Sequence, residues 1–209
     1  MSAPSFSPGI ILSVRPLRES DYIAVILTQD LGKIEAIARN ARKSTRRFSG
    51  GLDILDSGLF ELQKPLSGKT LYTLRSLEHK NLWKRLTSSL NLLSSALLIA
   101  EISERVCGLD DPNSSGVYCV LLETLICLDS LDKQSRISPV LVVALKQLLR
   151  HSGFSTQNTG AVSSSVSTTQ DSAIADSPVH ELRELLDYVE HCLEKPLKTR
   201  SNLQFPATS

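Results

Sequence analysis

Five cations stand within nine residues in the segment RNARKSTRR, which runs from residue 39 to residue 47 and contains no acid. Guanidinium and ammonium groups gathered on one surface bind the phosphates of nucleic acids. The alternative is a solvated surface loop without a partner. We take the segment as a candidate nucleic-acid contact, through Arg39, Arg42, Lys43, Arg46 and Arg47.

Other side chains could extend this contact. Phe48 follows the cations directly, so its ring is the aromatic group best placed to stack on a base. Tyr22, Phe60 and Tyr72 lie inside apolar runs and are expected in the core. Further cations could hold a second strand, namely Arg75, Lys80, Lys198 and Arg200.

The sequence lacks the usual arrangements for catalysis or metal binding. Neither G-x-S-x-G nor H-E-x-x-H occurs, and the SGKT of residues 67–70 lacks the upstream glycine of a phosphate-binding loop because Gln63 stands there. Asp53 and Asp56 could hold Mg²⁺ as in a nuclease, but the glycines around them favour turns. No two of the four cysteines have C-x-x-C spacing. We therefore predict no catalytic residue, no metal site and no cofactor.

Charge is divided unevenly along the 209 residues. Residues 1–80 carry 12 Lys/Arg and 8 Asp/Glu, a net of +4, whereas the remainder carries 11 and 14, a net of −3. This asymmetry indicates an anionic partner for the first part. The chain start lacks the features of a secretory signal, and residues 86–100 are too few and too rich in Ser to span a bilayer. We expect a cytoplasmic, nucleoid-associated protein with no membrane contact.

The first 80 residues have the pattern of a small barrel. They contain five short runs of apolar and β-branched residues with no helical period between them. Gly32 can take the positive φ of a hairpin turn after the second run. The strands are expected at residues 9–17, 22–28, 34–39, 58–64 and 70–77.

A helical period begins at Asn81, where leucines recur at steps of three and four. A second helix is marked by apolar residues from Val117 to Leu128. Ser138-Pro139 opens a third helix as a cap followed by a first-turn proline, and Ser177-Pro178 opens a fourth.

The fold class that follows is α+β. We expect an OB-type β-barrel over residues 1–80, followed by an α-helical domain over residues 81–209. Within the second part, residues 155–177 are rich in Ser and Thr and contain no Lys or Arg. Such a segment cannot bury enough apolar surface to offset its ordering entropy, so we expect a flexible linker.

The stretch from Gly9 to Leu52 resembles the start of the RecO family of bacterial recombination mediators. The similar features are an apolar strand that opens with Gly, an E-x-D step at Glu19 and Asp21, an L-T-x-x-x-G-K turn, and A-R-x-A-R-K-S at residues 38–44. Later similar segments are LYTL at residues 71–74, LLRHSGF at residues 148–154 and KPLKTR at residues 195–200.

The resemblance implies an OB-fold and a role without covalent chemistry. Proteins of this family bind single- and double-stranded DNA, pair complementary strands, contact RecR and the tail of single-strand-binding protein, and assist RecA loading. Asn40 stands where the family has Gly, but Asn tolerates a left-handed backbone well. The Ser/Thr-rich stretch occupies the place of paired C-x-x-C zinc ligands, so we expect the zinc module to be missing.

Three other functions fit the same residues. A basic barrel loop does not itself distinguish sugars, so an RNA-binding or ribosome-associated protein is one alternative. A protein-interaction adaptor acting through its helical domain is a second. A metal-dependent nuclease using Asp53 is a third.

The cysteine spacing gives a first testable prediction. The purified protein should contain no stoichiometric zinc, because no four ligands have the spacing of a structural zinc site. Elemental analysis of the purified chain checks this. About one zinc per chain would contradict the prediction and would implicate Cys107, Cys119 and Cys127, brought together by the fold.

Overall fold

The chain forms two compact units in a computed structural model. One unit combines residues 1–83 with 103–122, and the other combines residues 84–102 with 123–209. The division expected at residue 80 stays a prediction. The structure describes residues 4–44, 46–48, 51–64, 70–81, 83–111, 114–132, 136–154 and 178–203.

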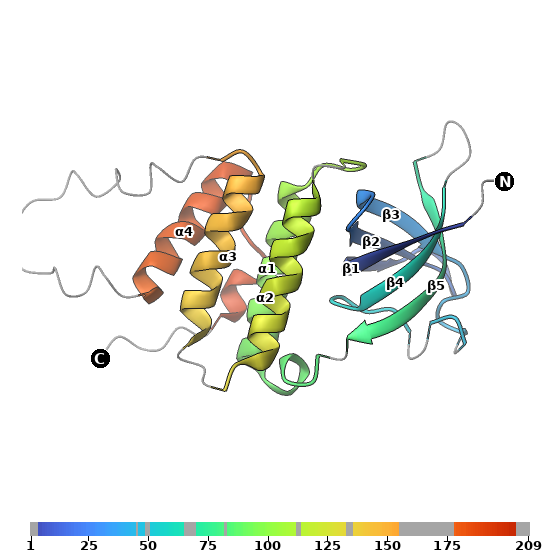
Figure 1. Cartoon of the computed structure of the whole chain (residues 1–209), viewed down its shortest axis with the longest axis horizontal. Coiled ribbons are helices and arrows are strands. Elements are labelled where there is room, and N and C mark those ends of the chain that lie inside the picture. Colours follow the sequence, from blue (N-terminus) through green and yellow to red (C-terminus); the bar gives the residue numbers. More distant parts are fainter. Residues whose placement is uncertain are drawn as a thin grey trace, which may run out of the picture. The chain divides into compact units, whose positions relative to one another are not determined.

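The first unit contains a closed barrel of five strands (Figure 1). The strand order around the barrel is β1-β2-β3-β5-β4, and every pairing is antiparallel except that of β3 with β5. This closed arrangement confirms the OB-fold that the sequence predicted. The strands are β1 (Ser5–Pro16), β2 (Tyr22–Thr28), β3 (Gly32–Ala38), β4 (Ser57–Gln63) and β5 (Tyr72–Asn81).

Strand β1 closes the barrel because it pairs on both sides. Its first half, from Ser5 to Ile10, pairs with β4, and the stretch from Gly9 to Pro16 pairs with β2. The register with β2 shifts between Ile11 and Ser13. Such a bulge bends a strand and increases its twist, which lets one strand serve both neighbours.

Alternating side chains fill the barrel. Along β3 every second residue is buried, as expected for a strand with one face in a core. Phe60 and Tyr72 lie in this core, as the sequence predicted, and Tyr22 packs against its edge. The remaining core members include Ile11, Ala24, Ile26, Ile34, Leu62, Leu74 and Leu77.

Among the described residues, four α-helices follow the barrel. They are α1 (Leu90–Val106), α2 (Ser115–Ser130), α3 (Ile137–His151) and α4 (Pro178–Leu193), with 3-10 turns at Leu86–Ser88 and Arg200–Asn202. None of the helices among the described residues is long and apolar enough to cross a membrane. The Ser/Thr-rich stretch at residues 155–177 lies outside the described residues.

Two expected boundaries were wrong. The first helix was expected to begin at Asn81, but β5 continues to Asn81 and α1 begins only at Leu90. The leucine pattern therefore included the end of a strand. Leu86, part of that period, is buried in a 3-10 turn. Helix α3 already includes Ile137, and its N-cap residue Arg136 makes no side-chain cap, so Ser138 is not the cap.

The start of β3, at the β2–β3 hairpin tip, is fixed to the last turn of α1 and to the segment that follows it. The Asp110 N–H donates to the Lys33 carbonyl at 2.8 Å, and Lys33 Nζ donates to the Glu104 carbonyl at 2.5 Å. Gly32 has φ +68°, and a Cβ there would lie 2.0 Å from the Asp111 carbonyl oxygen. Glycine is therefore required twice, by the backbone conformation and by the close approach.

Replacing Gly32 with Ala should destabilise the first unit by about 3 kcal/mol, because left-handed strain adds to a steric clash. Gly51→Ala is the matched control, since Gly51 has φ +96° but open space around it. It should cost about 1 kcal/mol, the strain alone. Urea unfolding of both variants measures the difference, and equal losses would show that the approach to Asp111 carries no energy.

Candidate nucleic-acid interface

The cationic segment from Arg39 to Arg47, called the basic loop here, leaves β3 through a left-handed residue. Asn40 has φ +54°, which confirms the expectation that Asn preserves this turn. The Asn40 N–H donates to Asp21 Oδ1 at 2.8 Å, and Ser20 Oγ donates to Asn40 Oδ1 at 3.0 Å. The Arg42 N–H donates to the Ser20 carbonyl at 3.2 Å. The β1–β2 turn thus holds the start of the basic loop.

The end of the basic loop is held by the barrel itself. Ala41 is 1% exposed and Phe48 is fully buried, and both belong to the barrel core. The Leu77 N–H of β5 donates to the Arg47 carbonyl at 3.2 Å. The described backbone of the basic loop is therefore anchored on both sides, as a fixed ridge would be.

Phe48 corrects one prediction. The sequence places it beside Arg47 as the residue to stack on a base, but its ring has no exposed surface. A base needs an accessible ring face. Phe48 instead secures the basic loop to the core, and it is not available for stacking.

Two of the five cations are engaged within the protein. Arg42 Nε donates to the Tyr22 hydroxyl at 2.9 Å, and its guanidinium lies 5.3 Å from the centre of the Tyr22 ring. Arg47 Nη2 donates to the Arg39 carbonyl at 2.8 Å, and its guanidinium lies 5.3 Å from the centre of the Phe48 ring. Both side chains therefore brace the loop.

The other three cations are Arg39, Lys43 and Arg46. They are exposed, as Arg42 also is, but no other described residue forms a hydrogen bond or ion pair with their side chains. Because the backbone is already fixed, such cations lose only side-chain freedom when they bind an anion, and the loop itself need not be ordered. Of the five cations, these three have the side chains most accessible to an anion.

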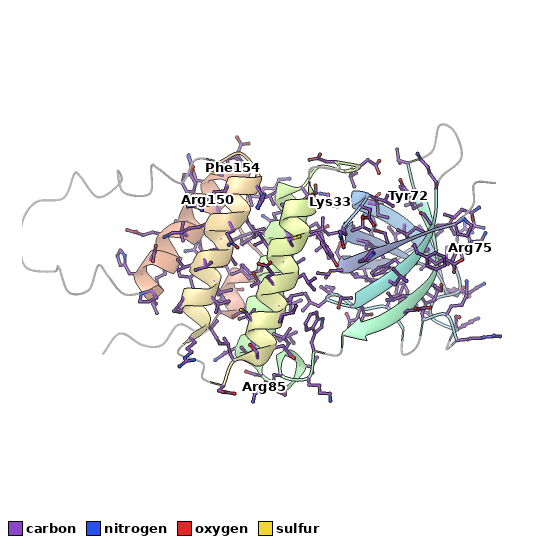
Figure 2. The ribbon with its side chains drawn as sticks, viewed as in Figure 1. Lys33, Tyr72, Arg75, Arg85, Arg150 and Phe154 are labelled. Carbon is purple, nitrogen blue, oxygen red and sulfur yellow. The ribbon has the colours of Figure 1, made fainter. Side chains whose placement is uncertain are left out.

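Arg75 lies in β5, two residues before Leu77, whose N–H binds the end of the basic loop. It is the extra residue where the β4–β5 register shifts, between the pairs Glu61–Ser76 and Leu62–Leu74. A bulge of this kind turns a side chain out of the regular alternation. Arg75 is exposed on the outside of the barrel (Figure 2), held by two hydrogen bonds to Gln63 Oε1 at 2.6 and 3.1 Å. Because Gln63 is neutral, the charge of Arg75 is not offset.

Arg200, predicted to help hold a second strand, is instead paired with acids of the protein. Its guanidinium donates to Asp187 at 2.6 Å and to Glu190 at 2.5 Å, and 27% of the side chain is exposed. Burial works against the charge of Arg200, but these two carboxylates raise its pKa above the ordinary value. Two acids already offset this cation, so Arg200 connects the chain end to α4, and DNA contact there is not supported.

Lys198 remains exposed, while its N–H donates to Glu101 at 2.9 Å. The side chain of Lys80 lies outside the description. Sequence reasoning missed Arg18, which is exposed in the β1–β2 turn that binds the basic loop. The E-x-D step that directly follows Arg18 was the available signal, because its Asp21 accepts a hydrogen bond from the Asn40 N–H and so brings this turn to the basic loop.

Asp53 and Asp56 form a turn. Asp56 Oδ2 accepts from the Asp53 N–H at 2.8 Å, and Asp53 Oδ1 accepts from the Ile54 N–H at 2.7 Å. Side chains that satisfy backbone donors in this way are typical of turns. Within the described parts of the chain, no three His, Cys, Asp or Glu side chains gather as a metal site would require.

Comparison with known proteins gives matches at both the domain and the chain level. Residues 1–83 match the family model described as recombination protein O N terminal. DNA repair protein RecO of Synechococcus sp. (strain JA-2-3B'a(2-13)) is 29% identical over 156 residues, which is 71% of this chain and 54% of the relative. DNA repair protein RecO of Symbiobacterium thermophilum is 29% identical over 117 residues, and that of Alkaliphilus metalliredigens is 28% identical over 155 residues.

Those two alignments cover 56% and 74% of this chain and 45% and 61% of the relatives. The chain thus spans about half the length of the curated relatives it matches. The family model covers the whole OB-fold barrel, including the basic loop and its anchors. The chain is therefore similar to the amino-terminal part of the RecO family over residues 1–83, and to DNA repair proteins RecO over 56% to 74% of its length.

Proposed function

We propose that this chain is a DNA-binding recombination mediator that acts without covalent chemistry. The observation that carries the proposal is the basic loop, whose backbone is fixed at both ends while Arg39, Lys43 and Arg46 stay exposed. A fixed ridge of cations binds the sugar–phosphate backbone whatever its sequence. The names of the relatives, which are DNA repair proteins, support DNA as the target.

The same chemistry accounts for both forms of DNA. Guanidinium and ammonium groups contact phosphates, which single strands and duplexes both present. Contacts of this class position the nucleic acid and carry no sequence information. The proposed role is therefore sequence-independent binding to single- and double-stranded DNA.

Strand pairing extends the proposal. Two DNA strands repel each other, and a cationic surface that holds both lowers this repulsion and raises their local concentration. Exposed cations outside the basic loop, Arg75 and Lys198 among them, could hold the second strand. The family resemblance adds contacts with RecR and the single-strand-binding protein tail, indirect assistance to RecA, and action at the nucleoid in the cytoplasm.

Salt dependence tests the proposal directly. Replacing Arg39, Lys43 and Arg46 together with Ala should reduce the slope of log affinity against log salt for single strands by about 2, from the loss of three phosphate contacts. The measurement is a titration of a labelled oligonucleotide at several salt concentrations. A matched RNA oligonucleotide as competitor distinguishes DNA binding from a preference for RNA.

The control variant removes the same number of exposed cations elsewhere. Lys84, Arg136 and Arg150 are exposed in the second unit. Their joint replacement with Ala changes net charge equally and should leave the slope nearly unchanged. An equal fall in both variants would mean that net charge, and not the basic loop, governs binding.

Annealing is the second test. The protein should accelerate pairing of complementary single strands with a chelator present and without nucleotide, because no step breaks a covalent bond. A fluorescence-quench assay at a salt concentration where binding is established measures the rate. A rate equal to the protein-free control would reduce the chain to a passive DNA binder.

A further inference from the structure

One aromatic side chain of the barrel is exposed although its strand neighbours are paired. Phe6 of β1 is 58% exposed, and among the described residues it is the one aromatic with that much open surface. The next residue, Ser7, is 2% exposed and faces inward. Because strand residues alternate, Phe6 stands on the outer face of the barrel.

The strand register places Phe6 in line with Arg75 and the basic loop. Phe6 pairs with Glu61 of β4, and Glu61 pairs with Ser76 of β5, directly after Arg75. Two inter-strand spacings separate the Cα atoms of Phe6 and Ser76 by about 10 Å. On the other side of β5, the Leu77 N–H binds the Arg47 carbonyl. The surface therefore runs from the basic loop across Arg75 to Phe6.

The charges along this row suit a single strand. Arg75 can bind a phosphate, since the residue that holds its guanidinium, Gln63, is neutral. Glu61 lies between Arg75 and Phe6 and accepts a hydrogen bond from Ser76 Oγ at 2.6 Å. A carboxylate there repels phosphate, so the group that reaches Phe6 must be uncharged, as a base is.

We propose that Phe6 is a base-stacking residue that makes the DNA site favour single strands. A phosphate bound at Arg75 leaves its base free to stack on the Phe6 ring, which every base can do through its π-face. A base within a duplex is already stacked and paired, so it cannot reach the ring without unpairing. This inference rests on the proposed DNA binding by the basic loop.

The test compares Phe6→Ala with wild type on a mixed-sequence single-stranded 20-mer and on the same sequence as a duplex. Single-strand affinity should fall about tenfold, from the loss of one base–aromatic stack, while duplex affinity stays within about twofold. The salt slope should not change, because no charge is removed. Phe6→Trp should restore single-strand affinity, since indole also stacks.

Leu109→Ala is the matched control, because Leu109 belongs to the same unit and is 57% exposed. It should leave both affinities unchanged. Thermal unfolding of each variant should show that the fold is retained, because the replaced side chains are exposed. If Phe6→Ala lowers neither affinity, or lowers both equally, stacking by Phe6 is wrong while DNA binding by the basic loop stands. If wild type binds neither DNA with a salt dependence, the proposed function fails, and this inference with it.

Discussion

Burial of the Phe48 ring is the constraint on which the candidate DNA surface depends. Full burial of a Phe side chain contributes roughly 2 to 3 kcal/mol, which offsets the backbone ordering cost of about two loop residues. Phe48 follows the last cation directly, so its position in the core fixes where the cations before it must lie. Ala41 is buried in the same core, and together the two residues turn a charged loop into a fixed part of the barrel surface.

The five cations of the basic loop fall into two groups: two hold the loop in shape, and three stay exposed. Five like charges within nine residues repel one another, and this repulsion opposes a compact loop. Arg42 and Arg47 reduce the cost by donating to the Tyr22 hydroxyl and to the Arg39 carbonyl, so that they hold the loop in shape. Arg39, Lys43 and Arg46 stay in water, which screens their charges and leaves them accessible to an anion.

The sequence predicted the elements better than the environments of single residues. Strands β2 and β3 were predictable because alternation along a strand is a local signal, and Asn40 because left-handed turns favour few residue types. Phe48 was misplaced because burial is decided by partners distant in sequence. Arg200 was misread for the same reason, since its acidic partners lie on α4 and nothing around Arg200 marks them as its neighbours.

The contact between the Leu77 N–H and the Arg47 carbonyl has a consequence for how the chain acquires its surface during synthesis. Strands β1 to β3 are joined by short connections. They can pair as soon as residue 38 has left the ribosome during synthesis. The basic loop gains its last anchor only when β5 has entered the barrel, thirty residues later in the chain. Non-local pairing of this kind is slow compared with hairpin formation. In a nascent chain the cations are therefore exposed before the basic loop is fixed. The loop geometry proposed for DNA binding forms late in folding.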